Sequence, residues 1–346
     1  MTGHTGFKGG WLSSWLLDAG ATVAGYALPP DTTPSFFQVC GLSERMTSHI
    51  GDIRNPDTLR DAVRASNPSI VFHLAAQPLV RRSLHDPIGT MTTNVIGTAH
   101  LLDILRHFPS LRAIVIVTSD KCYDTERSSL PFREDSPLGG LDPYSASKAC
   151  AEIVTHSFDA SFYGPESPAI ATARAGNVFG GGDWAEDRLL PDALRAALGG
   201  RTLALRNPES VRPWQHVLEP VSGYLQLAEG LVNSPEAARG AWNFGPDERD
   251  VVSVASIVDR FHAAWGDGAW QHVADAHASR ETRVLRLDSR KARSALRWAP
   301  RLRLDDAIEK TVLWYRQAAE TSADAAFKLT CDQIRQYEAL PPIART

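Results

Sequence analysis

The feature that most constrains the fold is a short apolar run followed at once by three polar residues. Ala113 to Val117 reads Ala-Ile-Val-Ile-Val, which is typical of a strand buried on both faces of a parallel sheet. Ser119, Asp120 and Lys121 then place a hydroxyl, a carboxylate and an amine just beyond that strand. In open α/β sheets the carboxyl edge is where ligands bind. The run therefore predicts a parallel sheet with a polar site at this edge.

A helix further along carries two more reactive side chains. Asp142-Pro143 has the form of an N-cap with proline at the first helical position. Tyr144 and Lys148 are four residues apart and fall on one helical face. A lysine beside a tyrosine favours the phenolate, so that a phenol of ordinary pKa about 10 can accept a proton near neutral pH. A solvated loop before a surface helix explains this spacing alone, but not its combination with Ser119.

The chain opens with a glycine-rich loop. Gly3, Gly6 and Gly9 are spaced GxxGxxG, and an apolar helix is predicted from Trp11 to Asp18. Such a loop brings backbone N–H groups and a helix N-terminus against a pyrophosphate. We expect His4 and Lys8 beside these phosphates, with Phe7 in the same loop; solvation of the two polar side chains is the alternative. No strand precedes the loop, so we expect a truncated first strand and a natural start upstream of Met1.

Strand and helix patterns alternate through the rest of the chain, which predicts a doubly wound α/β sheet. The second strand ends in Tyr26-Ala27-Leu28 without an acid to hold a ribose, so the choice between NAD and NADP stays open. Asp52 is expected to meet an adenine amino group. Asn94, within a helix predicted over Thr90 to Arg106, lies either beside the cofactor or in the core. Other candidates at strand ends and in the following loops are Ile53, Leu74, Ala75, Ala76, Arg81 and Arg82.

Composition narrows the class of protein. The 346 residues are 43% hydrophobic and 22% charged, enough for a large core and two lobes. A net charge of −4 without basic runs gives no reason to expect nucleic acid or a membrane surface as partner. The four cysteines are far apart without metal spacing, so we expect no metal, reduced thiols and a cytoplasmic location.

Several stretches together resemble the extended short-chain dehydrogenases/reductases, and among them the nucleotide-sugar 4,6-dehydratases. The resemblance covers nearly the whole chain. It rests on the following segments: 2–9, 73–83, 118–123, 144–148, 174–184 and 212–217. His4 with Lys8, the Asp120-Lys121 pair and Gly181-Gly182-Asp183-Trp184 narrow the resemblance from the superfamily to the dehydratases.

The resemblance implies an NAD-dependent lyase with CDP-glucose as substrate. Tyr144, Lys148 and Ser119 would oxidise C4, Asp120 and Lys121 would remove water across C5 and C6, and the hydride would return to C6. Gln77, Asn177 and Arg212 are implied as substrate contacts. The cofactor domain is expected over residues 1–176 and 211–246, and a substrate lobe over 177–210 and 247–346. A homo-oligomer, a dimer or a tetramer, is also implied.

Two other functions fit parts of this pattern. A nucleotide-sugar 4-epimerase would share Ser119, Tyr144, Lys148 and the cofactor but would have no use for Asp120 and Lys121. A dinucleotide-sensing protein without turnover would fit the missing strand, although the intact set of reactive side chains opposes it.

Overall fold

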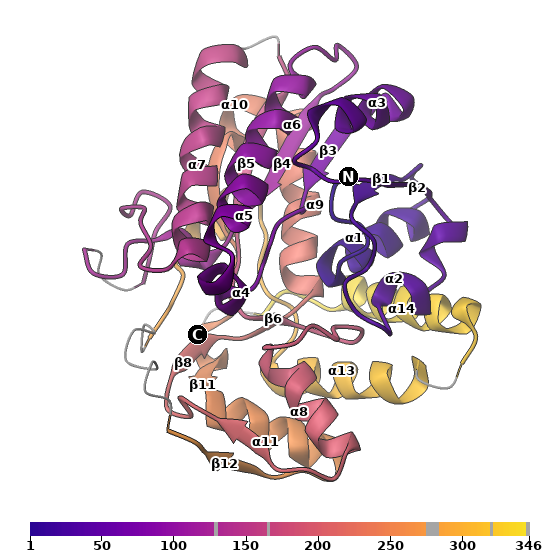
Figure 1. The fold of residues 1–346 in the computed structure, drawn as a ribbon, viewed down its shortest axis with the longest axis vertical. Coiled ribbons are helices and arrows are strands. Elements are labelled where there is room, and N and C mark those ends of the chain that lie inside the picture. The colour runs from indigo at the N-terminus through magenta and orange to yellow at the C-terminus, as the bar shows by residue number, and fades with distance from the viewer. Residues whose placement is uncertain (128–130, 165–166, 275–283, 319–320, 344–346) are drawn as a thin grey trace.

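A six-stranded parallel sheet forms the centre of the protein (Figure 1). The computed structural model describes residues 1–127, 131–164, 167–274, 284–318 and 321–343. In spatial order the strands are β2 (Thr47–Ile50), β1 (Ala24–Ala27), β3 (Ile70–His73), β4 (Ala113–Val117), β5 (Ala169–Arg174) and β10 (Gly240–Asn243). The predicted doubly wound parallel sheet is thereby confirmed.

Met1 to Gly3 occupy the gap between β1 and β3. Thr2 forms parallel bridges to Tyr26 and His73, and the Thr2 N–H donates to the Phe72 carbonyl at 2.9 Å. The Gly3 N–H donates to the Tyr26 carbonyl at 3.0 Å. These few residues supply the hydrogen bonds that join the two halves of the sheet, and they lead directly into the glycine-rich loop.

Each face of the sheet is covered by helices. Side chains of β4 alternate between two cores: Val115 packs into one with Trp11 and Val221, while Ile114 packs into the other with Leu101. Helices α1 (Phe7–Asp18) and α9 (Leu218–Asn233) belong to the first face, with α14 (Ala323–Ala339) against α1. Helices α3 (Pro56–Ser66), α6 (Gly97–Leu105) and α7 (Pro143–Phe162) belong to the second.

Short elements complete this domain. They are α2 (Phe36–Val39), α4 (Val80–His85), α5 (Pro87–Met91), α10 (Pro235–Ala238), the 3₁₀ turns Leu42–Glu44 and Asp120–Cys122, and a π-helical segment at Thr92–Ile96. The expected single helix from Thr90 to Arg106 is therefore wrong in detail, because this π-helical segment separates α5 from α6. Within it, Asn94 reaches two neighbouring elements through hydrogen bonds, described below.

A smaller lobe lies beyond the carboxyl edge of the sheet, at the bottom of Figure 1. Its elements are β6 (Val178–Phe179), α8 (Leu189–Leu198), β7 (Leu203–Leu205), β8 (Val211–Pro213), β9 (Gln215–His216), the 3₁₀ turn Glu248–Asp250, β11 (Val251–Ser253), α11 (Val254–Trp265), β12 (Trp270–His272) and α13 (Leu304–Ala318). Helix α12 (Arg290–Ala295) packs against β10 of the central domain instead. Strand β9 pairs with β6, and α9 begins two residues after it, at Leu218.

One buried carboxyl group ties the C-terminal helices to the central domain. Glu219 at the start of α9 is 1% exposed. It accepts hydrogen bonds from the Tyr337 hydroxyl at 2.7 Å and from the backbone N–H groups of Arg301 at 2.9 Å and Leu302 at 2.7 Å. Burial raises the pKa of Glu219 from its ordinary 4.5 to about 7, although these donors oppose the shift.

This raised pKa makes stability depend on pH in a defined window. The folded state binds the extra proton between pH 4.5 and about 7, so the associated stability is full below this window and is lost as the pH rises through it, by roughly 3 kcal/mol. In Glu219→Gln the amide oxygen can accept from both N–H groups while the amide nitrogen donates to Tyr337. We therefore expect the variant to gain stability relative to wild type between pH 5 and pH 8.

Urea unfolding at the two pH values measures this gain. Glu229→Gln is the matched control, because Glu229 is exposed on the same helix. Equal pH dependence in wild type, Glu219→Gln and Glu229→Gln would contradict the assignment.

Candidate active site

The carboxyl end of β4 turns directly into a tight polar corner. Ser119 Oγ accepts from the Lys121 N–H at 3.2 Å, which caps the 3₁₀ turn, and it donates to Asp120 Oδ1 at 3.1 Å. Asp120 is fully buried, and its Oδ2 has no hydrogen-bond partner among the residues described. A Cβ on Gly176 would lie 1.7 Å from that oxygen, so only glycine leaves room for the carboxylate there. Lys121 Nζ lies 3.8 Å from Asp120 Oδ1, and its side chain is 31% exposed.

Helix α7 brings Tyr144 and Lys148 to the same corner. Its capping follows the sequence prediction: Asp142 accepts from the Ser145 N–H at 2.9 Å, and Pro143 is the first helical residue. The Tyr144 hydroxyl is hydrogen-bonded to Ser119. Lys148 Nζ donates to the Val117 carbonyl at 3.2 Å, at the last residue of β4. The structure therefore brings together all five predicted catalytic residues.

Burial sets the charge state of these groups. It raises the pKa of Tyr144 to about 12, against the lowering effect of the Ser119 hydrogen bond. It lowers the pKa of Lys148 to about 8, against the attraction of Glu152. Desolvation has the largest effect on the pKa of Tyr144 and outweighs the neighbouring charges. The effect of Lys148 on the phenolate stays a prediction. For the Tyr144 phenol to act as a base near neutral pH, further positive charge must lie beside it to lower its pKa.

The glycine-rich loop is shaped by close backbone contacts. Gly3 has φ +76°, and a Cβ on it would lie 2.7 Å from the Ala75 nitrogen. A Cβ on Gly9 would lie 2.0 Å from the Gly3 carbonyl oxygen. Gly6 caps α1 without a side-chain hydrogen bond, so the first N–H groups of the helix, at Phe7 and beyond, are available to an anion.

The two polar side chains of this loop have different surroundings. His4 is fully buried beneath the loop, where Nε2 is hydrogen-bonded to Ser48 Oγ at 2.7 Å and the ring packs edge-on against Phe37. Lys8 instead extends toward the catalytic corner, and its Nζ donates to the Tyr224 hydroxyl at 3.3 Å. Burial lowers the pKa of Lys8 to about 7, helped by the charges of Arg188 and Lys148. Contact of either side chain with a phosphate stays a prediction.

The side chains expected near adenosine follow β2 and β3, which are separated in the sheet by β1 and Met1–Gly3. The Asp52 carboxylate pairs with Arg54, with Nε at 3.0 and 2.9 Å from its two oxygens. Ile53 is buried against Gly97. Leu74, Ala75 and Ala76 follow β3, where the N–H of Ala75 donates to Thr2 Oγ1 at 3.1 Å.

Asn94 is a hub between the β3 loop and α7. Its Oδ1 accepts from the Gln77 N–H at 2.8 Å, and its Nδ2 donates to Ser147 Oγ at 2.8 Å and to the Gln77 carbonyl at 3.1 Å. The Gln77 side chain is itself engaged, because its Nε2 donates to Thr90 Oγ1 at 2.9 Å and its Oε1 accepts from the Leu79 N–H at 2.7 Å. The amides of Asn94 and Gln77 therefore hold the loop after β3 against α7.

The other predicted substrate residues lie at the start of the smaller lobe and within it. Asn177 has φ +48°, and its buried Oδ1 lacks a partner among the residues described. Arg212 on β8 is 9% exposed, and its Nη1 donates to the Val211 carbonyl at 3.0 Å. Arg81 on α4 pairs with Asp187 at 2.9 Å, which connects the two lobes across the site.

Sequence reasoning missed two residues that bear on this centre. Arg188, at the N-cap of α8, pairs with Asp183 at 3.1 Å, and its charge acts on both Tyr144 and Lys8. Tyr224 on α9 receives the Lys8 hydrogen bond across 216 residues of sequence. Neither lies in a recognisable local motif, so spacing alone could not reveal them.

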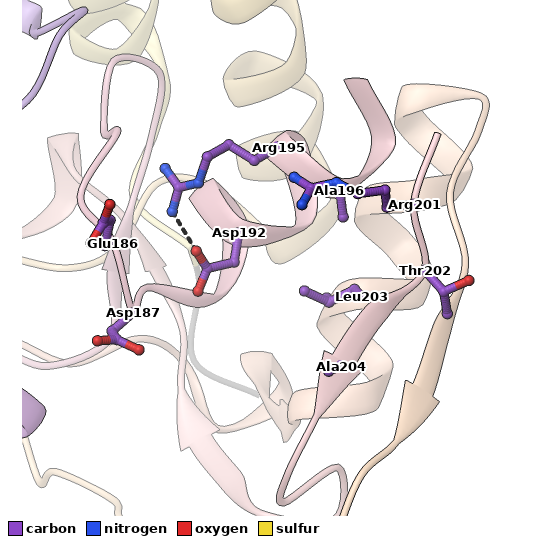
Figure 2. Close-up of a pocket in the computed structure, with 9 residues that line it drawn as sticks. All are labelled: Glu186, Asp187, Asp192, Arg195, Ala196, Arg201, Thr202, Leu203 and Ala204. Carbon is purple, nitrogen blue, oxygen red and sulfur yellow. Dashed lines mark hydrogen bonds and ion pairs between the residues drawn. The ribbon is translucent and has the colours of Figure 1, made fainter. Parts of the chain in front are cut away.

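A separate hollow of about 420 Å³ lies between α8 and β7, and Figure 2 shows the residues that line it. Its lining includes Asp192, Arg195 and Thr202, with an Asp192–Arg195 ion pair inside it, and none of the residues around β4 and α7. Within the described ranges, no group of side chains is suited to hold a metal ion. No described helix is long and apolar enough to span a membrane.

A doubly wound sheet with serine, tyrosine and lysine at its carboxyl edge defines the extended short-chain dehydrogenase/reductase class. Comparison with known proteins narrows this class. A family model described as GDP-mannose 4,6 dehydratase matches residues 1–311. The chain therefore belongs to the GDP-mannose 4,6-dehydratase family.

Individual relatives agree with this placement. The chain is 47% identical over 321 residues to a CDP-glucose 4,6-dehydratase of Salmonella typhimurium, covering 91% of this chain and 89% of the relative. It is 27% identical to a UDP-glucose 4-epimerase of Mycolicibacterium smegmatis, covering 92% and 99%. The solved dTDP-glucose 4,6-dehydratase of Bacillus anthracis in complex with NAD has a TM-score of 0.75 at 22% identity, covering 93% and 97%, which shows the shared fold.

Proposed function

We propose that this protein is an NAD-dependent CDP-glucose 4,6-dehydratase, which converts CDP-glucose to CDP-4-keto-6-deoxyglucose. The observation that carries the proposal is the junction of Ser119, Asp120 and Lys121 with Tyr144 and Lys148 at one sheet edge, in a chain 47% identical to a CDP-glucose 4,6-dehydratase. This set contains both an oxidation group and an elimination group. An epimerase needs only the first.

The loop and strand ends fit a bound dinucleotide. The close contacts at Gly3 and Gly9 leave backbone rather than side chains facing the N-terminus of α1, which suits a pyrophosphate. When bound, the nicotinamide supplies a reversible hydride acceptor. The residues proposed to hold NAD are Gly3, His4, Gly6, Phe7, Lys8, Gly9, Asp52, Ile53, Leu74, Ala75, Ala76, Asn94, Tyr144 and Lys148; His4 would act from beneath the loop, through Ser48.

Oxidation at C4 is assigned to Tyr144. Its phenolate takes the proton of the C4 hydroxyl while hydride leaves C4. Ser119 holds the phenol oxygen through its hydrogen bond, and the Lys148 ammonium lies on the same helical face. Because burial raises the pKa of Tyr144, the positive charges of Lys148, Arg188 and the oxidised nicotinamide ring would be needed to bring that pKa down in the loaded enzyme.

Elimination is assigned to Asp120 and Lys121. The C4 ketone acidifies the hydrogen on C5, which Lys121 removes as a neutral amine. Asp120 in its acid form protonates the C6 hydroxyl, so that the C6–O bond breaks and water leaves. Return of the hydride to C6 and of a proton to C5 completes the reaction. Partial exposure of Lys121 lets its amine reach a sugar, while the carboxyl of Asp120 is held against Gly176.

The two lobes are proposed to bind different ligands. Residues 1–176 and 211–246 would bind the dinucleotide, and residues 177–210 and 247–346 the nucleotide sugar. Two parts depart from these bounds: β8 and β9 pair with strands of the smaller lobe, and α14 packs against α1 of the central domain. Asn177 and Arg212 are proposed contacts to the nucleotide diphosphate, since an unpartnered amide oxygen and a guanidinium suit its hydroxyl and phosphate groups. The Gln77 side chain is hydrogen-bonded to Thr90 and Leu79, so Gln77 would contribute by fixing the shape of the loop after β3.

Surface and thiol chemistry support a proposal for assembly and location. Ile88, Ile96 and Ile153 are exposed on neighbouring α5, Thr92–Ile96 and α7, and we propose that two chains associate through this apolar face. Sedimentation velocity measures this association, and a monomer at micromolar concentration would contradict it.

The four cysteines are unpaired, which supports a cytoplasmic location with reduced thiols.

Product identification tests the proposed reaction. Purified protein incubated with CDP-glucose and NAD should yield a product lighter by one water, with a C6 methyl group by NMR. A product of unchanged mass that is inverted at C4 would support the epimerase instead. Absence of any conversion with CDP-glucose would contradict the proposal.

Replacing Lys121 by methionine should separate elimination from oxidation. The variant keeps the apolar stem but removes the amine, so C4 oxidation should still reduce NAD in a single turnover while water loss slows by about 10²–10⁴-fold. Absorbance of the reduced cofactor should then rise and persist. Tyr144→Phe is the matched control, because it should abolish cofactor reduction itself. Near wild-type product formation by Lys121→Met, or no reduction although substrate binds, would overturn the role of Lys121.

A further inference from the structure

A buried ion pair lies directly behind the catalytic corner. Glu152 on α7 pairs with Arg174 at the end of β5, with Nε–Oε1 at 2.9 Å and Nη2–Oε2 at 2.8 Å. Both side chains are only 4% exposed. Two threonines complete the shell of the carboxylate: Thr118 donates to Oε1 at 2.5 Å, and Thr172 donates to Oε2 at 2.6 Å. Each carboxylate oxygen therefore accepts two hydrogen bonds.

The same pair reaches the elements that carry the reaction. Glu152 follows Lys148 by four residues, so both side chains leave α7 on one face. Its partner Thr118 stands between Val117, whose carbonyl accepts from Lys148, and Ser119, which bonds Tyr144. Arg174 also donates to the Tyr123 hydroxyl at 2.8 Å, just beyond the Asp120–Cys122 turn. One carboxylate thus connects the ends of β4 and β5 to the catalytic helix.

A buried ion pair is a costly way to fill a core, because both charges must leave water. An apolar pair of similar volume would satisfy packing alone. The Glu152–Arg174 ion pair, four residues along α7 from Lys148, therefore points to an electrostatic task.

The charges that face Lys148 come from several elements. Lys8 on α1 and His73 on β3 are electrostatically coupled to it, and Cys122 in the 3₁₀ turn and Glu152 on its own helix also act on it. Burial lowers the pKa of His73 to about 3 and raises that of Cys122 well above its ordinary value, so both are neutral near pH 7. Lys8 repels a second positive charge. Of these four, Glu152 alone supplies negative charge.

We propose that Glu152, fixed by Arg174, is a positioning residue that keeps Lys148 protonated and holds the carboxyl end of β4 in register with α7. It touches neither substrate nor cofactor and acts through Lys148, Thr118 and Thr172. One part of this proposal depends on the proposed function, namely the role of Lys148 in C4 oxidation. Without the Glu152 charge, burial lowers the pKa of Lys148 further, so the ammonium is lost at lower pH.

The test compares charge removal with charge retention. Glu152→Gln removes the charge but keeps the size, and Glu152→Gln with Arg174→Gln removes both charges so that no unpaired guanidinium is left. Glu152→Asp retains the charge. Asp159→Asn is the matched control. Asp159 lies on α7, 11 residues beyond Lys148, and forms an ion pair with Arg239 at the end of α10.

The first readout is the pH profile of cofactor reduction in a single turnover. We expect the basic limb to move to lower pH by about one unit or more in both charge-removing variants. It should stay near the wild-type position in Glu152→Asp and Asp159→Asn. A lower rate with an unmoved limb in the charge-removing variants would mean a purely structural role and would overturn the proposal.

The second readout needs neither cofactor nor substrate. Lys148 binds its proton more weakly in the folded state, about 8 against an ordinary 10.5, so folding stability rises with pH through this window. A further lowering in Glu152→Gln should produce a stability deficit that shrinks as the pH rises from 6 to 9. In a Lys148→Met background that pH dependence should vanish. If the stability deficit of Glu152→Gln does not change with pH in the protein that keeps Lys148, the proposal is contradicted. If the wild-type enzyme shows no turnover, only the proposed function is contradicted.

Discussion

The rest of the site depends on the burial of both faces of β4. Its side chains alternate between two cores, so the strand can carry no polar group along its length. Polar side chains are therefore confined to the carboxyl edge of the sheet, where Ser119 and Asp120 follow the end of β4. Helix α7 is anchored at that edge through Lys148 and Glu152. The position of the catalytic groups is thus a consequence of how the sheet is covered.

The same burial explains why the site is poised for charged ligands. Desolvation raises the pKa of Tyr144 to about 12 and lowers those of Lys148 to about 8 and Lys8 to about 7. Each shift disfavours the charged form that the proposed chemistry uses. A dinucleotide and a nucleotide diphosphate would bring both positive and negative charge into this space. Coupling between ligand binding and protonation is then expected from the fold itself.

Local signals in the sequence predicted the parts of the site that depend on short-range geometry. The bounds of β4 and the Asp142–Pro143 cap match the expectation. Long-range contacts could not be predicted, because no spacing rule joins Lys8 to Tyr224 or Glu152 to Arg174. The raised pKa of Tyr144 could not be predicted for a related reason: burial is a property of the packed core, and the sequence shows only the neighbouring lysine.

The central claim is that one sheet edge both oxidises C4 and eliminates water across C5 and C6, with the hydride kept in the site between the two events. Conversion of CDP-glucose carrying deuterium at C4 tests this most directly. The account predicts that the deuterium appears in the C6 methyl group of the same molecule, with one solvent hydrogen at C5. Deuterium that remains at C4 beside an intact C6 hydroxyl, or that is lost to solvent, would contradict it.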